Sequence, residues 1–211
     1  VQAFKFRDRL AYSWHEHGEI KAGISFSDLL KTSDLIAARL QSQFKPGERI
    51  ALIFGPGLDF IEAFFGCTRA GLVPVPLSPS LGRHQFAPIL PILINCQAAA
   101  VLGPELLWKR QQSHAKSAEQ IHDFIWLNWA SVKAEAQDLM AVRQPVSQGD
   151  IAFLQYTSGS TGNPRGVIVG HSNVLHNLQQ IIERCASNRP RKMLSWLPHF
   201  HDMGLVGGFL S

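Results

Sequence analysis

The chain has 211 residues, of which 45% are hydrophobic and 17% are charged, so it has the composition of a globular domain and not of a disordered segment. Its net charge of +4 comes from basic residues that are scattered without interleaved aromatic residues, which argues against nucleic-acid binding. The 3 cysteines lie far apart in no Cys-x-x-Cys arrangement, which predicts neither a disulfide framework nor a zinc site and fits a cytoplasmic protein.

The first half of the chain alternates strand-like and helix-like segments. A hairpin turns near Gly18, and a helix then begins at Ser27 or Asp28 with its apolar residues at helical spacing. The apolar strand RIALIF follows, and after it comes a helix rich in phenylalanine. The alternation continues with a helix at 86–94, a strand at 98–102, a helix at 105–120, a strand at 124–127 and, much later, a helix from about 173.

Two prolines, Pro74 and Pro76, interrupt the strand-like segment GLVPVPLSP. Because proline cannot donate a hydrogen bond to a neighbouring strand, we expect this segment at an edge of a sheet. Strands separated by helices of this length indicate βαβ units, so we predict an α/β fold with mostly parallel sheets and helices on both faces. No apolar run is long enough for an integral membrane segment, and the first residues lack the pattern of a signal peptide.

A loop of small, hydroxylated and glycine residues lies between two short apolar strands in IAFLQYTSGSTGNPRGVIVGH, residues 151–171. Its glycines allow backbone conformations that place several N–H groups around an anion, and its hydroxyls can donate to phosphate oxygens. Arg165 adds a positive charge, and Pro164 fixes the backbone just before it. The pattern favours a polyphosphate-binding loop that includes Thr157, Ser158, Gly159, Ser160, Thr161, Gly162 and Arg165.

Two other interpretations fit parts of this loop. The same residue types also form ordinary hairpin turns that bind no ligand. A Walker loop needs a Gly-Lys-Ser or Gly-Lys-Thr end and a helix that begins there, and neither is present, because Arg165 is followed by Gly166 and a strand-like run. Phosphate would therefore be bound by backbone amides, hydroxyls and one guanidinium group.

The loop sequence YTSGSTGNPRGV resembles the phosphate-binding signature of the adenylate-forming superfamily, which includes acyl-CoA synthetases, fatty acyl-AMP ligases and peptide-synthetase adenylation domains. Family members usually carry lysine at the position of Arg165, so the charge is kept while a planar, bidentate group replaces a point charge. KPGERIALIFGPGLDFIEAFFGCTRAGLVPVPLSP resembles an early segment of the same superfamily. The resemblance implies that residues 1–211 form part of the large N-terminal domain, with the phosphate loop at 156–166 and without the C-terminal lid domain.

A second informative stretch is SWLPHFHDMGLVGG at 195–208, which follows the start of a strand predicted at Met193–Leu197. From the residues alone, His199, His201 and Asp202 suggest a metal site or a His-Asp proton relay, although no further ligand is evident. The stretch resembles the superfamily motif Trp-Leu-Pro-x-x-His-Asp-Met-Gly, most closely that of fatty acyl-AMP ligases. His199 fills a variable position of the motif and receives no role. The resemblance implies a catalytic His201 beside the substrate carboxylate and the α-phosphate, and an acyl pocket that includes Trp196, His201, Met203 and Gly204.

Together the two motifs imply ATP-dependent activation of a carboxylate, which needs no general base because a carboxylate is already a nucleophile. The resemblance implies ATP and Mg²⁺ as cofactors with no metal ligand in these residues, a fatty acid as substrate, and an acyl carrier protein or CoA as acceptor. Two alternatives stay open: an acyl-CoA synthetase or amino-acid adenylation domain with the same first half, and a non-catalytic binding module that keeps the fold. Because the family's adenine, ribose and lid elements fall outside this stretch, we expect no ATP–pyrophosphate exchange from residues 1–211 alone.

Overall fold

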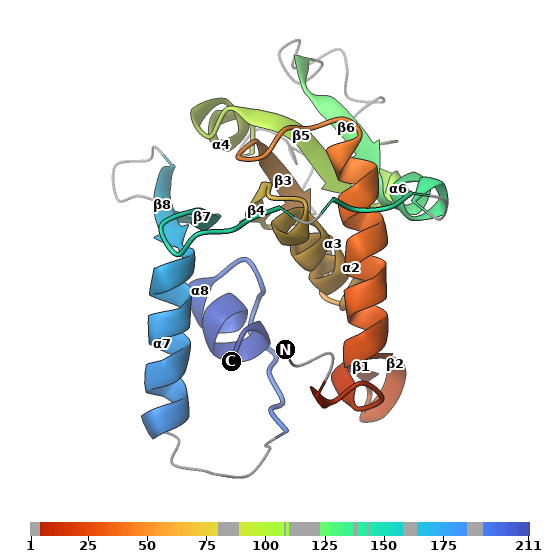
Figure 1. The fold of residues 1–211 in the computed structure, drawn as a ribbon, viewed down its shortest axis with the longest axis vertical. Helices are drawn as coiled ribbons and strands as arrows, with labels where there is room; N and C mark the ends of the chain where they lie inside the picture. The colour runs from red at the N-terminus through yellow and green to blue at the C-terminus, as the bar shows by residue number, and fades with distance from the viewer. Residues whose placement is uncertain are drawn as a thin grey trace.

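The computed structural model of the chain describes residues 5–79, 89–107, 109, 123–136, 139–142, 144–157, 164–184 and 192–211. A small hairpin, a four-stranded parallel sheet with its helices, and a second hairpin with a long helix follow one another along the chain (Figure 1). No helix in these ranges is long and apolar enough to cross a membrane.

The N-terminal hairpin pairs β1 (Leu10–Glu16) with β2 (Glu19–Ser25) in antiparallel register. Its turn is made by His17 and Gly18, which confirms the predicted turn position. Both residues have a positive φ, 50° and 82°, as in the two-residue turns whose twist matches that of the paired strands.

Helix α2 (Phe26–Gln41) begins directly after the hairpin. The Ser25 hydroxyl accepts a hydrogen bond from the Asp28 backbone N–H at 3.1 Å and donates to the Asp28 carboxylate at 2.6 Å. Ser25 is therefore the N-cap residue, and the predicted start at Ser27 or Asp28 is too late.

A four-stranded parallel sheet lies at the centre of the first half of the chain, in the order β4-β3-β5-β6. The predicted alternation and the parallel direction are both confirmed. β4 contains Pro74 and Pro76 and pairs only with β3 among the described strands, so the edge position expected from the prolines is also confirmed. The strands are β3 (Arg49–Ile53), β4 (Val73–Leu77), β5 (Ala98–Gly103) and β6 (Ile125–Asn128).

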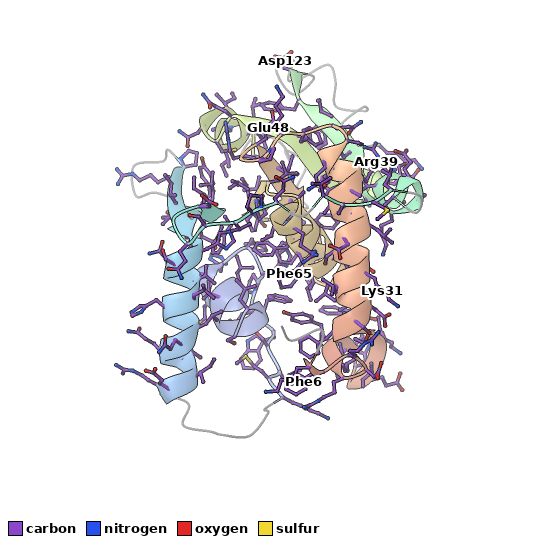
Figure 2. All side chains as sticks on the ribbon, in the orientation of Figure 1. Phe6, Lys31, Arg39, Glu48, Phe65 and Asp123 are labelled. Atoms are coloured by element: carbon purple, nitrogen blue, oxygen red, sulfur yellow. The ribbon has the colours of Figure 1, made fainter. Side chains whose placement is uncertain are left out.

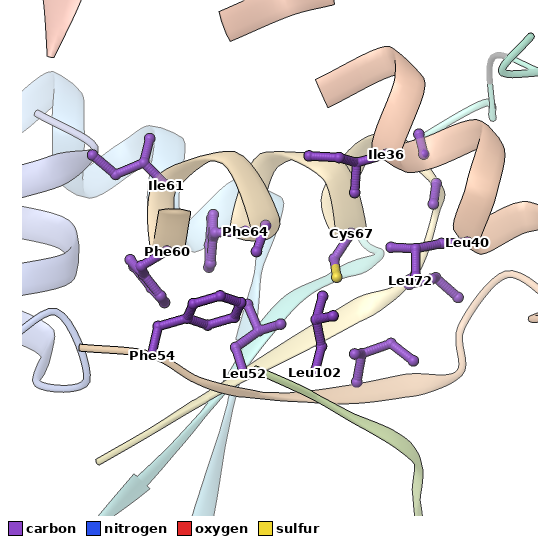
Figure 3. Packing of buried hydrophobic residues seen from close by; sticks show 14 of the residues in the cluster. Ile36, Leu40, Leu52, Phe54, Phe60, Ile61, Phe64, Cys67, Leu72 and Leu102 are labelled. Atoms are coloured by element: carbon purple, nitrogen blue, oxygen red, sulfur yellow. The ribbon is translucent and has the colours of Figure 1, made fainter. Parts of the chain in front are cut away.

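Helices cover both faces of this sheet, and each face has its own apolar cluster. On one face, α2 and α3 bring Ile36, Phe60, Phe64 and Cys67 against Leu52 and Leu102 of the sheet (Figure 3). On the other face, α4 contributes Leu93. Alternate residues of β3 belong to the two clusters, as the period of a strand requires. The helices are α3 (Leu58–Arg69), α4 (Leu90–Asn95) and, after β6, α6 (Trp129–Glu135).

Two predicted helices lie only partly within the described residues. The helix expected at 86–94 is represented by α4, and residues 86–88 lie outside the described ranges. The helix expected at 105–120 is helical at 105–107 and 109, and the rest of that range lies outside.

The C-terminal part contains an antiparallel hairpin, a long helix and a compact turn. β7 (Ile151–Thr157) pairs with β8 (Arg165–Gly170), which confirms the two strands predicted on either side of the loop. Helix α7 (His171–Arg184) follows β8 directly and begins slightly before the predicted residue 173. The chain then reaches α8 (Asp202–Gly204) and the π-helix η2 (Leu205–Phe209).

The strand predicted at Met193–Leu197 is wrong, because residues 192–196 have no regular secondary structure. Among the described strands none pairs with this segment. Its apolar side chains are exposed, Leu194 to 77% and Trp196 to 87%. An apolar, β-prone run becomes a strand only when another strand satisfies its backbone hydrogen bonds.

Candidate active site

The β7–β8 hairpin holds both ends of the predicted phosphate loop. Thr157 at the end of β7 is paired with Arg165 at the start of β8, and both side chains are exposed at the open end of the hairpin. Arg165 forms no ion pair with any other described residue, so its guanidinium group is available to an anionic ligand. The predicted loop residues between these two lie outside the described residues: Ser158, Gly159, Ser160, Thr161 and Gly162.

Tyr156 fixes the hairpin beside the parallel sheet. Its hydroxyl donates a hydrogen bond to Asn95 Oδ1 at 2.5 Å, at the end of α4. Its ring covers Gly166 on the opposite strand, where an added Cβ would lie 2.8 Å from the ring. The absence of a side chain at Gly166 therefore leaves room for the Tyr156 ring beside β8. Burial raises the pKa of Tyr156, with a smaller contribution from Cys96.

His201 lies in a tight turn at the start of α8. Its backbone N–H donates to the Pro198 carbonyl at 3.1 Å, and its carbonyl accepts from the Leu205 N–H at 2.8 Å. Gly204 closes the turn, because a Cβ there would lie 2.0 Å from the Pro198 carbonyl oxygen, closer than any side chain allows. The Asp202 carboxylate accepts a hydrogen bond from the Met203 N–H at 2.7 Å. The turn thus presents the exposed His201 imidazole from a backbone with little freedom.

The four residues predicted to line an acyl pocket differ in exposure. Gly204 is buried against Pro198, whereas Trp196, His201 and Met203 are exposed. The exposed fractions of Trp196 and Met203 are 87% and 66%. These side chains offer apolar surface on one side of the turn, and Gly204 acts as the packing contact that shapes it.

A direct contact joins the two motifs. Gln155 lies in β7 two residues before Thr157, and its side-chain amide donates a hydrogen bond to the backbone carbonyl of Phe200. Phe200 immediately precedes His201. The end of β7 that leads into the phosphate loop is therefore tied to the turn that carries the histidine, although 45 residues separate the two partners in sequence.

His199 is buried, in contrast to His201. Its exposed fraction is 1%, and its ring centroid lies 3.9 Å from that of Phe60 in α3. Burial lowers the pKa of His199 to about 4, and a hydrogen bond with the Phe54 backbone opposes this shift in part. The imidazole is accordingly neutral at physiological pH and acts as part of the packed core.

The described part of the candidate site contains no metal cluster. No group of three His, Cys, Asp or Glu side chains among the described residues could hold a metal ion. The metal site considered for His199, His201 and Asp202 is thus not formed. What the described residues offer is the Arg165 cation, the Thr157 hydroxyl, and an exposed imidazole tied to the same strand.

Sequence reasoning missed Gln155 and His199. A signal for Gln155 was available, because it is the polar residue inside the apolar strand IAFLQYT, and a buried polar side chain normally has a hydrogen-bonding reason. For His199 no local signal existed, because its burial depends on Phe54 and Phe60, far away in sequence.

Comparison with known proteins finds one family match and several similar proteins. The family described as AMP-binding enzyme matches residues 1–211. A medium-chain-fatty-acid acyl-carrier-protein ligase, JamA of Moorena producens, is 34% identical over 96% of this chain and 35% of its own length. A long-chain-fatty-acid AMP ligase, FadD32 of Mycolicibacterium smegmatis, is 32% identical over 97% of this chain and 33% of its own length.

A solved structure gives the same result at the level of the fold. The fatty acyl-adenylate ligase from L. pneumophila, in complex with acyl adenylate and pyrophosphate, matches with a TM-score of 0.86 and 32% identity. The match covers 99% of this chain and 36% of that one. The chain spans about a third of the length of the relatives it matches.

Proposed function

The chain belongs to the AMP-binding enzyme family, and we propose that it supplies the phosphate-binding loop and the carboxylate-facing turn of an enzyme that activates a fatty acid with ATP. The observation that carries this proposal is the hydrogen bond from Gln155 to the Phe200 carbonyl, because it joins the two motifs that the reaction requires. Similarity to JamA, FadD32 and the L. pneumophila ligase favours a fatty acid over other carboxylic acids.

The reaction follows from the chemistry of the two partners. A carboxylate oxygen attacks the α-phosphorus of ATP, the bond to the bridging oxygen breaks, and pyrophosphate leaves with its electron pair. Catalysis then depends on orientation and on neutralising the charge of the phosphates. Thr157, the loop amides and Arg165 would bind the phosphate oxygens, and His201 would orient the carboxylate toward them.

Bound Mg²⁺ would neutralise phosphate charge during the same step. We assign no ligand to it, because the described residues hold no suitable cluster. The free thiols of Cys67 and Cys96 fit the cytoplasmic location that the sequence predicts. For the second half-reaction we propose the phosphopantetheine thiol of a carrier protein as the acceptor, in preference to free CoA.

Product analysis of the full-length protein tests the proposal. Given ATP, Mg²⁺ and a medium- or long-chain fatty acid, it should accumulate acyl-AMP and pyrophosphate and transfer the acyl group to a carrier protein, as measured by mass spectrometry. Efficient acyl-CoA formation would assign the protein to the acyl-CoA synthetases. Preferential activation of amino acids would assign it to the adenylation domains of peptide synthetases, and no adenylate from any acid would indicate a non-catalytic module.

A further inference from the structure

Two buried polar side chains anchor the turn that carries His201, and they do so from different parts of the fold. Gln155 has an exposed fraction of 6% and lies in β7, between the apolar Leu154 and the aromatic Tyr156. Its amide nitrogen donates to the Phe200 carbonyl, whereas its Oε1 is buried without a hydrogen-bond partner among the described residues.

His199 forms the second anchor, on the side of the parallel sheet. Its ring packs on Phe60 at 3.9 Å and meets Phe200 edge-on at 5.5 Å. Its hydrogen bond with the backbone of Phe54, the residue after β3, raises the pKa of the ring. Only a group that accepts a hydrogen bond from the ring has this effect, so the acceptor is the Phe54 carbonyl oxygen. Because Nε2 is buried without a partner among the described residues, the ring donates through Nδ1.

The two anchors act on consecutive residues just before His201. The Phe200 carbonyl is held by β7, and the His199 side chain is held by the segment that joins β3 to α3. Neither anchor uses the imidazole of His201, which stays exposed. A peptide fixed at residues 199 and 200 leaves residue 201 little room to shift relative to Thr157 at the end of the same strand β7.

Packing alone does not account for these two residues. Each leaves one buried polar atom without a partner among the described residues, which lowers stability, and an apolar residue of similar volume would avoid that cost. What Gln155 and His199 contribute is therefore the position that their hydrogen bonds impose on the backbone, and not the burial of apolar surface.

We propose that Gln155 and His199 are positioning residues that set the distance between His201 and Thr157, at the end of β7, and thereby the alignment of the substrate carboxylate with ATP. This inference rests on the proposed function. Both side chains are buried, and they act through hydrogen bonds to the backbone of Phe200 and Phe54.

The test uses four substitutions in the full-length protein. Gln155→Met keeps the length of the side chain and removes the donor, and His199→Phe keeps the ring and removes the hydrogen bond. Gln179→Met and His176→Phe are matched controls, because both residues are exposed on α7. His199→Asn is the conservative variant, because its amide nitrogen can replace Nδ1 as donor.

Kinetics separate positioning from mere stability. Gln155→Met and His199→Phe should each lower kcat/KM for the fatty acid by about ten- to hundred-fold, because a small misplacement of a catalytic group has effects of this size. The KM for ATP should change less than about two-fold, and His199→Asn should recover part of the loss. Equal effects on both substrates, or a lowered melting temperature with unchanged kinetics, would overturn the proposal.

Hydrogen exchange gives a readout that is independent of activity. The backbone amides of 197–205 should exchange faster in Gln155→Met and His199→Phe than in the wild type, while the amides of β3 in these variants exchange at the wild-type rate. In both control variants the amides of 197–205 should also exchange at the wild-type rate. If the wild-type protein forms no acyl-AMP, the proposed function fails and the exchange of 197–205 still decides whether the two residues anchor the turn. Unchanged exchange in both variants would show that they do not.

Discussion

The parallel sheet and the region around α7 use similar side chains in opposite environments. In β3, Ile50 and Leu52 have no exposed surface, because α2 and α3 cover them. In β8, Val167 and Ile168 are exposed to 50% and 67%, and α7 has no buried residue along its length. Figure 2 shows side chains of α7 projecting outward along the helix. An amphipathic pattern therefore records only which face can be buried, and the neighbouring elements decide whether it is.

The candidate site lies at the border between these two regions. β7 contributes Phe153 to the buried core and ends at the exposed Thr157. The His201 turn is similarly anchored on one side by buried residues and exposed on the other. The candidate site therefore has a buried, packed side that holds its residues in place and an exposed side that leaves Thr157 and His201 accessible.

The largest expected effect is on stability, and it is seen when an isoleucine is shortened to alanine in each of the two regions. Ile50→Ala should lower the free energy of unfolding by about 2–5 kcal/mol, because it removes buried methyl groups and leaves a cavity in the sheet. Ile182→Ala in α7 should change it by about 0.5 kcal/mol or less, because the side chain is 63% exposed. Urea denaturation monitored by circular dichroism measures both. Similar losses for the two variants would mean that the face of α7 is buried in solution.

Substitutions in the phosphate loop, between the two regions, should lower the rate of adenylate formation and leave the free energy of unfolding nearly unchanged. In the full-length protein, Arg165→Ala and Thr161→Ala should each weaken transition-state binding by about 1.5–3 kcal/mol, because a charge-assisted or desolvated hydrogen bond is lost. Adenylate formation, followed by pyrophosphate release, should then fall about ten-fold or more. Arg165→Lys keeps the charge and should retain most of the rate. Normal rates in both alanine variants would identify the loop as an ordinary turn.

The buried His199 and the exposed His176 should differ in how they make the free energy of unfolding depend on pH. His199 has a pKa of about 4 in the folded protein and about 6.5 when unfolded, so the unfolded chain binds more protons between these values. The stabilising contribution of the neutral ring is complete above pH 6.5 and is lost as the pH falls toward 4. Between pH 7.5 and pH 5 the free energy of unfolding should decrease by roughly 2 kcal/mol through this residue.

The variant His199→Phe should lose that part of the acid sensitivity, whereas His176→Phe, at an exposed position of α7, should keep it. Urea titrations at the two pH values provide the measurement. An identical decrease in the wild type and in His199→Phe would place the acid-sensitive group elsewhere.

The smallest expected effect concerns the exposed apolar side chains of β8 and α7. Leu175, with 57% of its side chain exposed, can be changed to Gln with a change in unfolding free energy of about 0.5 kcal/mol or less. The same substitution together with Ile168→Thr should reduce the binding of a hydrophobic fluorescent dye, because both side chains contribute exposed apolar area. Unchanged dye fluorescence in the double variant would show that this face is covered.

The sequence by itself determined the elements whose signals are local. The β-branched runs on either side of a glycine-rich loop predicted β7 and β8, and Pro74 and Pro76 predicted the edge strand β4, because backbone geometry and hydrogen-bonding capacity are properties of the residues themselves. The two motifs likewise identified Arg165 and His201 as candidates, although the loop residues at 158–163 lie outside the described residues and their role stays a prediction.

Only the tertiary structure decided the features that depend on distant partners. The run Met193–Leu197 is β-prone and apolar, yet it is no strand, because pairing requires a second strand that its own sequence does not encode. The link from Gln155 to Phe200 and the burial of His199 on Phe60 join residues that are far apart in the chain. A hydrogen bond or a ring contact between such residues arises only when the fold brings both to the same place, and no local pattern records that distance.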